Sequence, residues 1–431
     1  MRTRIALLGL VLLPSTVIAQ VIQARFVTSG YAWERQDTIG RASQNFYAHQ
    51  SLQFSLAKDQ FSFHAYGQGF QNFGSRDYTD PSYRLYSVSF KASSLFEMVD
   101  LAIGRQTIFA GVGVGTIDGG MAGLRLWDSR IRFVGYYGIL PPPQYKFEVT
   151  KDRENNRMMG GQLILSPIDE VRFSGSYMQR KIQPQSYTAI RRDSLFQPFP
   201  IEIRPNATAE EYLSGDLEFD DGELISATLR YDYDLLWEKT SRIQAFVRGN
   251  VYDRISVTGE YFYREPRLSY NSIFSVFTYN TINEYEAGVE YAFVKTSTLV
   301  RQVFGKFGYV SYGDENSNRI TVGVSGSYGS LSFSHNIGYA GKLSGAFLSA
   351  GYPMFEGLVT PTVLFSFAQY KLSDQAPSTS ALSGAIGAVC RPWSTLAVDA
   401  QVQWIRNTIY ASDTRLFIRA SYSVFENLNL F

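Results

Sequence analysis

The sequence predicts an all-β chain that crosses a membrane as a transmembrane, antiparallel, up-and-down β-barrel, and three observations lead to this fold class. Apolar and polar residues alternate with a period of two along most of the 431 residues, as in strands with one apolar face. Short turns and longer polar loops follow each other in alternation. Aromatic residues form 15% of the chain and gather near the ends of the predicted strands, as in the girdles of membrane barrels.

The first 19 residues have the pattern of a secretory signal peptide. Arg2 and Arg4 precede the apolar run 5–13, and the small Ala19 precedes the predicted cleavage site. That run is too short for a membrane helix, which needs about 18 residues. We therefore expect residues 1–19 to be a signal peptide and residues 20–431 to form one barrel domain. Without Arg2 and Arg4 the 40 basic residues become 38, against 39 acidic ones, so no nucleic-acid partner is expected.

The predicted strands have one apolar and one polar face. In the segment RLFIRASYSV (415–424), Leu416 and Ile418 share one face, whereas Arg415 and Arg419 share the other. The segments 242–251, 284–293 and 396–404 alternate in the same way. We expect residues 415–424 to be the closing strand.

The connections distinguish a membrane barrel from a soluble sandwich. Short turns are predicted within 57–61, 95–101, 126–131, 165–173, 219–224, 251–257, 328–333, 354–360, 391–398 and 424–430. Longer loops are predicted at 74–81, 140–156, 182–209, 265–280, 313–317, 371–379 and 407–413. Short periplasmic turns and longer extracellular loops are typical of bacterial outer-membrane barrels, and the pattern gives about 22 strands, within a range of about 18 to 24. A propeller, the alternative architecture, places four shorter strands in each repeat of ~40 residues.

The terminal Phe431 resembles the C-terminal signal that barrel-assembly machinery reads. The usual signal has apolar residues at alternate positions, but Asn427 and Asn429 stand there. With this signal we expect a location in the outer membrane of a Gram-negative bacterium, with the assembly machinery and outer-membrane lipid as partners.

The polar phase of the strands is predicted to line the lumen, because hydrocarbon offers no partner to polar groups. The predicted pore-lining residues are Arg125, Arg130, Arg132, Arg172, Arg180, Arg242, Arg248, Asp216, Glu218, Glu260, Glu284, Glu286 and Glu290. Two interpretations stay open. The charges pair across neighbouring strands, or they form a transverse field that orients a polar solute, as charged rings do in selective pores.

Three further features stand out. Arg105 falls in the lipid-facing phase, where an arginine costs roughly 2–4 kcal/mol, so we expect a bulge at Gly104 to turn it inward, or else its side chain to reach the membrane interface. The aromatic loop 263–282 either folds into the lumen or forms a hydrophobic rim. The segment GVGVGTIDGG (111–120) lacks the strand–helix context of a phosphate-binding loop and is predicted to be a flexible rim loop.

The sequence gives no sign of an enzyme, a metal site or a cofactor. It contains three histidines and one cysteine, Cys390, and no catalytic constellation stands out. A hairpin turning at Lys58–Asp59 places His64 opposite Gln53 and His49 opposite Gln68, so the two histidines are not adjacent. A barrel enzyme remains the third hypothesis.

Two segments, VDLAIGRQTIFAGVGVGTIDG (99–119) and YNSIFSVFTYNTINEYEAGVEYAF (270–293), are similar to stretches in outer-membrane barrels of metal-reducing bacteria. Some of those barrels are the porin component of porin–cytochrome conduits. The resemblance implies a barrel fold and, as an alternative function, a sheath around multihaem cytochromes for electron transfer. The residues themselves favour a porin-like channel for small polar or charged solutes.

Overall fold

The computed structural model describes residues 21–74, 82–192, 194–266, 280–293, 299–339, 341–373 and 375–427. The predicted signal peptide 1–19, most of the aromatic loop 263–282 and the predicted assembly signal Phe431 lie outside the described residues. These three predictions therefore stay predictions.

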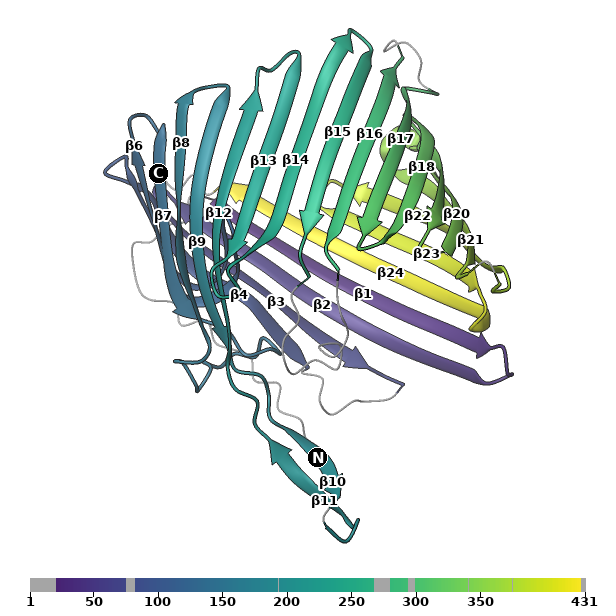
Figure 1. Ribbon diagram of the computed structural model, residues 1–431, viewed down its shortest axis with the longest axis horizontal. Helices are drawn as coiled ribbons and strands as arrows, with labels where there is room; N and C mark the ends of the chain where they lie inside the picture. Colours follow the sequence, from purple (N-terminus) through teal and green to yellow (C-terminus); the bar gives the residue numbers. More distant parts are fainter. Residues whose placement is uncertain are drawn as a thin grey trace.

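The chain forms a closed barrel of 22 antiparallel strands (Figure 1). Each barrel strand pairs with its neighbour in sequence, except that β9 pairs with β12 across an inserted hairpin. The first strand, β1, pairs with both β2 and the last strand, β24, and this seam closes the sheet. The predicted fold class and strand number are confirmed.

The first part of the barrel consists of β1 (Val21–Asp37), β2 (Ala42–Lys58), β3 (Phe61–Asn72), β4 (Tyr83–Leu95), β5 (Val99–Ala110), β6 (Gly113–Leu126), β7 (Ile131–Ile139), β8 (Arg157–Ile168), β9 (Val171–Ile182), β12 (Thr208–Asp220) and β13 (Ile225–Asp234). The second part consists of β14 (Lys239–Tyr252), β15 (Ile255–Arg264), β16 (Ile282–Ala292), β17 (Gln302–Tyr312), β18 (Glu315–Gly326), β19 (Gly329–Gly338), β20 (Gly341–Gly351), β21 (Val359–Lys371), β22 (Thr379–Trp393), β23 (Leu396–Arg406) and β24 (Tyr410–Asn427). Outside the barrel wall lie β10 (Tyr187–Arg192), β11 (Pro198–Ile203) and the 3-10 helix η2 (Phe355–Gly357).

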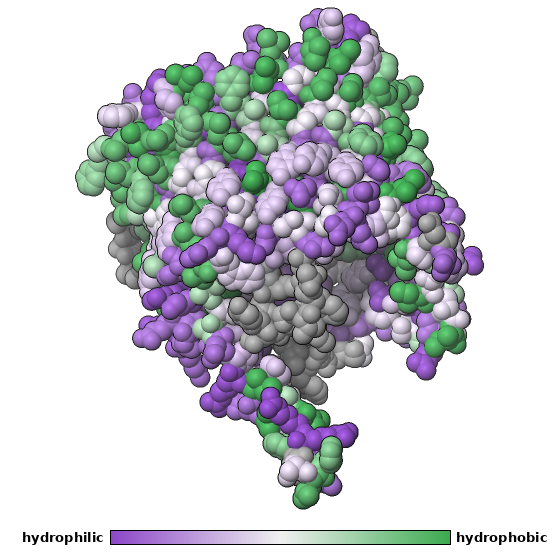
Figure 2. Space-filling model, viewed as in Figure 1, coloured by the Kyte–Doolittle hydropathy of each residue, from purple (hydrophilic) through white to green (hydrophobic). Residues whose placement is uncertain are grey.

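The outer face of the wall carries the apolar phase of the strands. Leu52 on β2 and Phe26 on β1 face each other across the register, and both are exposed. Figure 2 shows hydrophobic residues over the upper part of the wall and polar residues toward the protruding hairpin. An apolar exterior on a closed sheet is the arrangement that hydrocarbon requires, because closure leaves no unpaired backbone edge. This is the architecture of outer-membrane barrels.

The two rims differ as the sequence predicts. The tight connections, among them those after β2, β6 and β12, lie at the rim where β1 begins and β24 ends. In the β12–β13 turn, Asp221 accepts hydrogen bonds from the backbone N–H groups of Ile225, Glu223 and Leu224. These bonds lower the pKa of the Asp221 carboxyl and fix the turn.

Two predicted boundaries were wrong. The closing strand is longer than 415–424, since β24 spans Tyr410–Asn427. The predicted loop 182–209 contains the β10–β11 hairpin, which projects from the rim of longer loops (Figure 1).

No helix in the described ranges is both long and apolar enough to cross a membrane.

Candidate functional site: the lumen and its inward-folded hairpin

The hairpin formed by β5 and β6 extends beyond both of its neighbours in the wall. The pairing of β4 with β5 ends at Val88 and Arg105, and the pairing of β6 with β7 ends at Asp118 and Ile139. Beyond that level, β5 and β6 continue to pair only with each other, up to Ala110 and Gly113. We call residues 106–117 the lumenal hairpin.

The sequence explains why the lumenal hairpin leaves the wall. Gly104 has a φ of 121°, a conformation that side chains rarely allow. Three prolines, 141–143, follow β7 shortly after its last residue. Proline has no N–H to donate, so β7 cannot continue as a partner for β6 beyond Asp118.

The lumenal hairpin packs on the inner face of β7, β8 and β9. Ile108, Ile117 and Met158 are fully buried, at 0% exposure, in a cluster with Val134 and Met178. The backbone N–H of Val112, in the turn, donates to the hydroxyl of Ser176 at 2.9 Å. The hairpin is therefore held by a dry apolar contact of the kind that maintains protein interiors.

The glycines of GVGVG allow this close contact. A Cβ on Gly113 would lie 1.9 Å from the Tyr136 hydroxyl oxygen, and one on Gly111 would lie 2.1 Å from Ser176 Oγ. A Cβ on Gly115 would lie 2.9 Å from the Met158 sulfur. The prediction of a flexible rim loop at 111–120 was wrong, because residues 113–120 belong to β6. Residues 113–117 pack on the wall, and residues 118–120 pair with β7 within it.

The free side of the lumenal hairpin borders two polar cavities along β9 and β12–β15. One, of about 370 Å³, is lined by Val112 and Val114 together with charged residues such as Arg180, Asp232 and Arg242. The other, of about 480 Å³, is lined by Phe109 and Val114 and by further charged and polar side chains of the wall. The hairpin thus narrows the lumen next to a charged wall.

Charges on the inner face of β9 to β16 form ion pairs within one strand, between adjacent strands or across one intervening strand. Arg180 pairs with Glu210, and Arg172 pairs with Glu218 at 3.4 Å. Asp232 is bound by Arg230 at 2.9 Å and by Arg242 at 2.6 Å. Further along, Arg248 pairs with Glu290 at 3.0 Å, and the Gln244 amide donates to Glu260 at 3.2 Å.

A second charge cluster spans β16, β17 and β18. Glu286 accepts from Lys306 at 2.8 Å and from Arg319 at 2.7 Å. Arg319 also pairs with Glu284. Two carboxylates are therefore balanced by two cations within three adjacent strands.

A third cluster closes the seam between β1 and β24. Asp413 is fully buried, at 0% exposure, between Arg35 at 3.0 Å and Arg415 at 2.7 Å. Arg35 in turn lies over the Trp33 ring. A carboxylate with two guanidinium partners satisfies the rule that a buried charge must be paired.

The predicted pore-lining residues occupy different places. Those from Arg172 to Glu290 lie in the barrel strands in the polar phase, with the pairs given above, and Asp216 lies 3.7 Å from Arg230. Arg125 pairs with Asp100 at 3.0 Å and lies opposite Arg132 in the register. Arg130 was wrongly predicted in a strand, since it lies in the turn after β6 and donates to the Pro167 carbonyl.

Sequence reasoning missed Asp232, Arg319 and Asp413. Asp232 shares a phase with Arg230 in LRYDYD, so the alternation carried the signal. Asp413 was missed because residues 407–413 were predicted to be a loop. Nothing in the spacing along the chain marks Arg319 as the partner of carboxylates from another strand.

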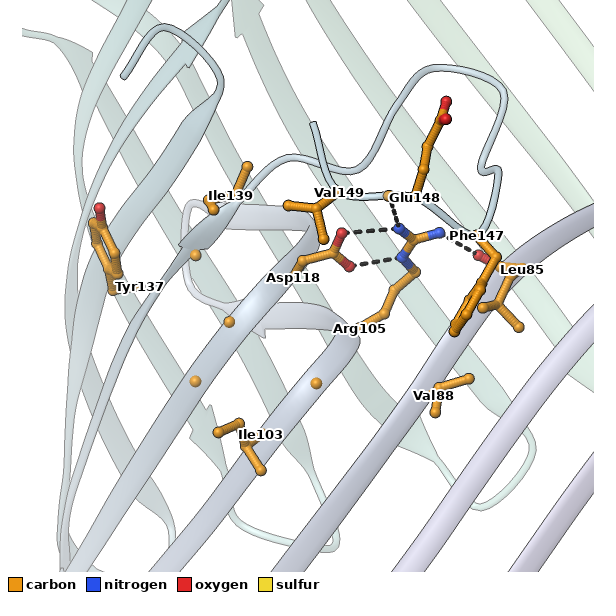
Figure 3. A pocket seen from close by; sticks show the side chains of 14 residues that line it. Leu85, Val88, Ile103, Arg105, Asp118, Tyr137, Ile139, Phe147, Glu148 and Val149 are labelled. Carbon is orange, nitrogen blue, oxygen red and sulfur yellow. Dashed lines mark hydrogen bonds and ion pairs between the residues drawn. The ribbon is translucent and has the colours of Figure 1, made fainter. Parts of the chain in front are cut away.

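Arg105 stays in the lipid-facing phase, so the predicted inward turn was wrong. The register on both sides of Gly104 is unbroken, and Arg105 lies opposite Asp118 with its side chain only 7% exposed. The β7–β8 loop covers it, as Figure 3 shows. The alternative of a side chain reaching the membrane interface was also wrong, because the guanidinium is enclosed by protein.

The histidines of β2 and β3 lie apart in the register. His64 lies opposite Ser55 and His49 lies opposite Phe70, so the predicted register was wrong by two residues, although the two histidines are indeed not adjacent. Among the described residues, no group of three His, Cys, Asp or Glu side chains could hold a metal ion.

Comparison with solved structures finds barrels at low identity. A mutant of the ferric enterobactin receptor (PfeA) from Pseudomonas aeruginosa has a TM-score of 0.56 and 9% identity, over 93% of this chain and 80% of that chain. A chain of the E. coli P pilus tip assembly intermediate PapC-PapD-PapK-PapG has a TM-score of 0.53 and 8% identity, over 95% and 61%. OccK2 (OpdF) from Pseudomonas aeruginosa, in complex with glucuronate, has a TM-score of 0.41 and 9% identity, over 94% and 98%.

The likeness to the first two structures shows a shared fold and nothing finer. No protein family model matches the sequence, and no curated protein matches it. None of the structures described above is specific to a cytochrome conduit.

Proposed function

We propose that this protein is a bacterial outer-membrane channel for small polar or charged solutes, with the lumenal hairpin as its constriction. In this proposal residues 1–19 direct export, and Phe431 contributes to recognition by the assembly machinery. The predicted pore-lining residues other than Arg130, together with Arg230, Asp232 and Arg319, line the solute path. Multihaem cytochromes remain the partners of the alternative, in which the barrel is a conduit sheath.

The observation that carries the proposal is the lumenal hairpin packed beside a wall of paired charges. A hairpin held by fully buried apolar side chains narrows the passage permanently. The cavities of about 370 and 480 Å³ beside it have charged linings. A polar solute that passes there exchanges water for charged side chains, as solutes do in selective pores.

The arrangement favours solutes with both donors and acceptors over simple ions. Arg180, Arg242 and Asp232 line one cavity together, so a guanidinium and a carboxylate meet the same solute. Because these charges are already paired, each can share a hydrogen bond with a solute without leaving an unpaired buried charge.

The test is single-channel conductance in a planar bilayer. Replacing residues 108–115 by Asn-Gly, a two-residue hairpin turn, removes the tip of the lumenal hairpin and is expected to raise the conductance of the channel. The matched control removes 187–203, the β10–β11 hairpin outside the barrel, and is expected to leave conductance unchanged. Heat-modifiable migration on gels shows that each variant has folded.

Folded protein that forms no channel with or without the lumenal hairpin contradicts the proposal. If the protein conducts and a haem-bearing partner then blocks the current, the sheath function replaces it.

A further inference from the structure

An apolar cavity lies on the outer wall beside Arg105. It measures about 530 Å³ and is lined by Val88, Ile103, Tyr137, Phe147 and Val149, among others (Figure 3). It opens where the lumenal hairpin has left the wall and the β7–β8 loop has taken its place. Cavities of this size are ordinary for ligand sites.

A missing side chain creates the cavity. The register places Gly120 between Ile103 on β5 and Tyr137 on β7, in the outward phase. A Cβ on Gly120 would meet the Ala102 carbonyl oxygen at 3.7 Å and no other atom nearer than 4 Å. A Cβ therefore fits there without a clash, and the glycine leaves that space open.

The cavity faces the hydrocarbon region. Ile103 is 66% exposed and Phe147 is 75% exposed, and both are side chains that a membrane barrel turns to lipid. Arg105 is six residues beyond the start of β5, or about 20 Å along the strand at ~3.3 Å per residue. With a strand tilt of about 45°, the cavity lies roughly 14 Å from the short-turn rim, within the apolar band of about 25 Å.

The charged pair at the edge of the cavity offers no free donor. Arg105 Nε and Nη2 donate to the two Asp118 oxygens at 2.6 and 2.8 Å. Its remaining N–H groups donate to the carbonyls of Leu85, Lys146 and Glu148 at 3.0, 2.9 and 3.1 Å. All the donors of a guanidinium are thus used.

Water is a poor occupant of this cavity, because water needs polar partners. An empty cavity is also unfavourable, because its lining loses dispersion contacts. We propose that the cavity is a specific binding site for one acyl chain of a membrane lipid. Lipid tails are as apolar as leucine, so shape and close packing, rather than hydrophobicity, distinguish this chain from its neighbours in the bilayer.

The test uses a photoreactive phospholipid. The full chain is reconstituted in vesicles of phosphatidylethanolamine and phosphatidylglycerol that contain a phosphatidylethanolamine with a diazirine on one acyl chain. After illumination, mass spectrometry locates the crosslinks. We expect them to concentrate on Ile103, Tyr137 and Phe147. Gly120→Leu fills the cavity and is expected to lower these crosslinks about tenfold, equivalent to ~1.4 kcal/mol.

The matched control is Gly215→Leu. Gly215 lies on β12 in the outward phase of Leu213, with no atom within 4 Å of its Cβ position, and its replacement is expected to leave the crosslinks unchanged. If Gly120→Leu does not fold, Phe147→Ala, on the loop, removes one wall of the cavity and is expected to lower the crosslinks as well. Crosslinks spread evenly around the barrel overturn the proposal. Crosslinks unchanged in the variants overturn it too, as does a crosslink between two protein chains at this patch.

Discussion

Arg105 and Asp118 face each other across β5 and β6 at the level where the lumenal hairpin leaves the wall. Their bidentate ion pair, at 2.6 and 2.8 Å, lies at the last level at which β5 still pairs with β4 and β6 still pairs with β7. The same guanidinium binds carbonyls of the β7–β8 loop. One side chain therefore joins the wall, the base of the lumenal hairpin and the loop that replaces it.

Removing one member of this pair is expected to be costly. Asp118→Asn leaves an enclosed guanidinium without its counter-charge, and breaking a buried pair costs about 3–5 kcal/mol. The measurement is urea unfolding of the protein in lipid vesicles. The double variant Arg105→Leu with Asp118→Leu is expected to recover part of the loss. A loss below about 1 kcal/mol in the single variant would mean that the pair is solvated.

The packing of the lumenal hairpin gives a second prediction. Gly113→Ala places a Cβ 1.9 Å from the Tyr136 hydroxyl oxygen, so the hairpin must move away from the wall. We expect altered conductance and noisier single-channel currents. Gly175→Ala, where nothing lies within 4 Å of the Cβ position, serves as the control. Identical traces from the two variants would show that the hairpin does not border the conducting path.

The Tyr136 hydroxyl supplies a third prediction. It is buried and has no hydrogen-bond partner among the described residues, and such a group costs about 1–3 kcal/mol. Tyr136→Phe removes the hydroxyl and keeps the ring, so we expect the free energy of unfolding to stay the same or to rise by about 1 kcal/mol. A clear loss of stability would show that the hydroxyl has an unseen partner, such as a water molecule.

The facing of the strands gives a fourth prediction. Val247, on the outer face of β14, is exposed, and Val247→Arg is expected to cost roughly 2–4 kcal/mol. Gln401 on β23 lies opposite Phe417 in the polar phase, and Gln401→Arg is expected to be tolerated. The yield of folded, heat-modifiable barrel measures both. Equal yields would mean that the two faces are assigned wrongly.

Ion selectivity tests the charge clusters. Arg319→Gln leaves Glu284 and Glu286 with one cation, Lys306, so the passage gains negative charge and reversal potentials are expected to shift toward cations. The shift should shrink with salt, since the Debye length falls from about 30 Å at 0.01 M to about 3 Å at 1 M. Arg204→Gln, on the exposed hairpin loop, is the control.

Much of the fold could be predicted because the pattern of a membrane barrel is repetitive. Alternation placed the outer and inner phases, as in β14 and β24, and the two kinds of connection located the rims. Register was harder. The β2–β3 turn is at Asp59–Gln60 and not at Lys58–Asp59, and this step of one residue displaced the partners of both histidines by two.

The lumenal hairpin could not be predicted, because its position depends on contacts between distant segments. The need for glycine at position 113 follows from the nearby Tyr136 hydroxyl, and the need for glycine at position 111 follows from the nearby Ser176 side chain. The lipid-phase position of Arg105 did mark the region as unusual. Arg105 can stay in this phase because a loop replaces part of the wall. This loop supplies the carbonyl of Glu148, which lies 43 residues farther along the chain than Arg105.

The seam between β1 and β24 has a consequence for how the barrel is made. Asp413 accepts a hydrogen bond from Arg35 across a sequence separation of 378 residues, so this contact closes a very large loop of the chain. The chain loses the entropy of loop closure before the contacts of the seam can stabilise it, and folding is therefore slow. Until β24 arrives, the growing sheet has an unpaired edge at β1 that can join another chain. Closure of the seam is therefore the step at which insertion into the membrane competes with aggregation. The ion pairs of Asp413 with Arg35 and Arg415 stabilise the closed barrel.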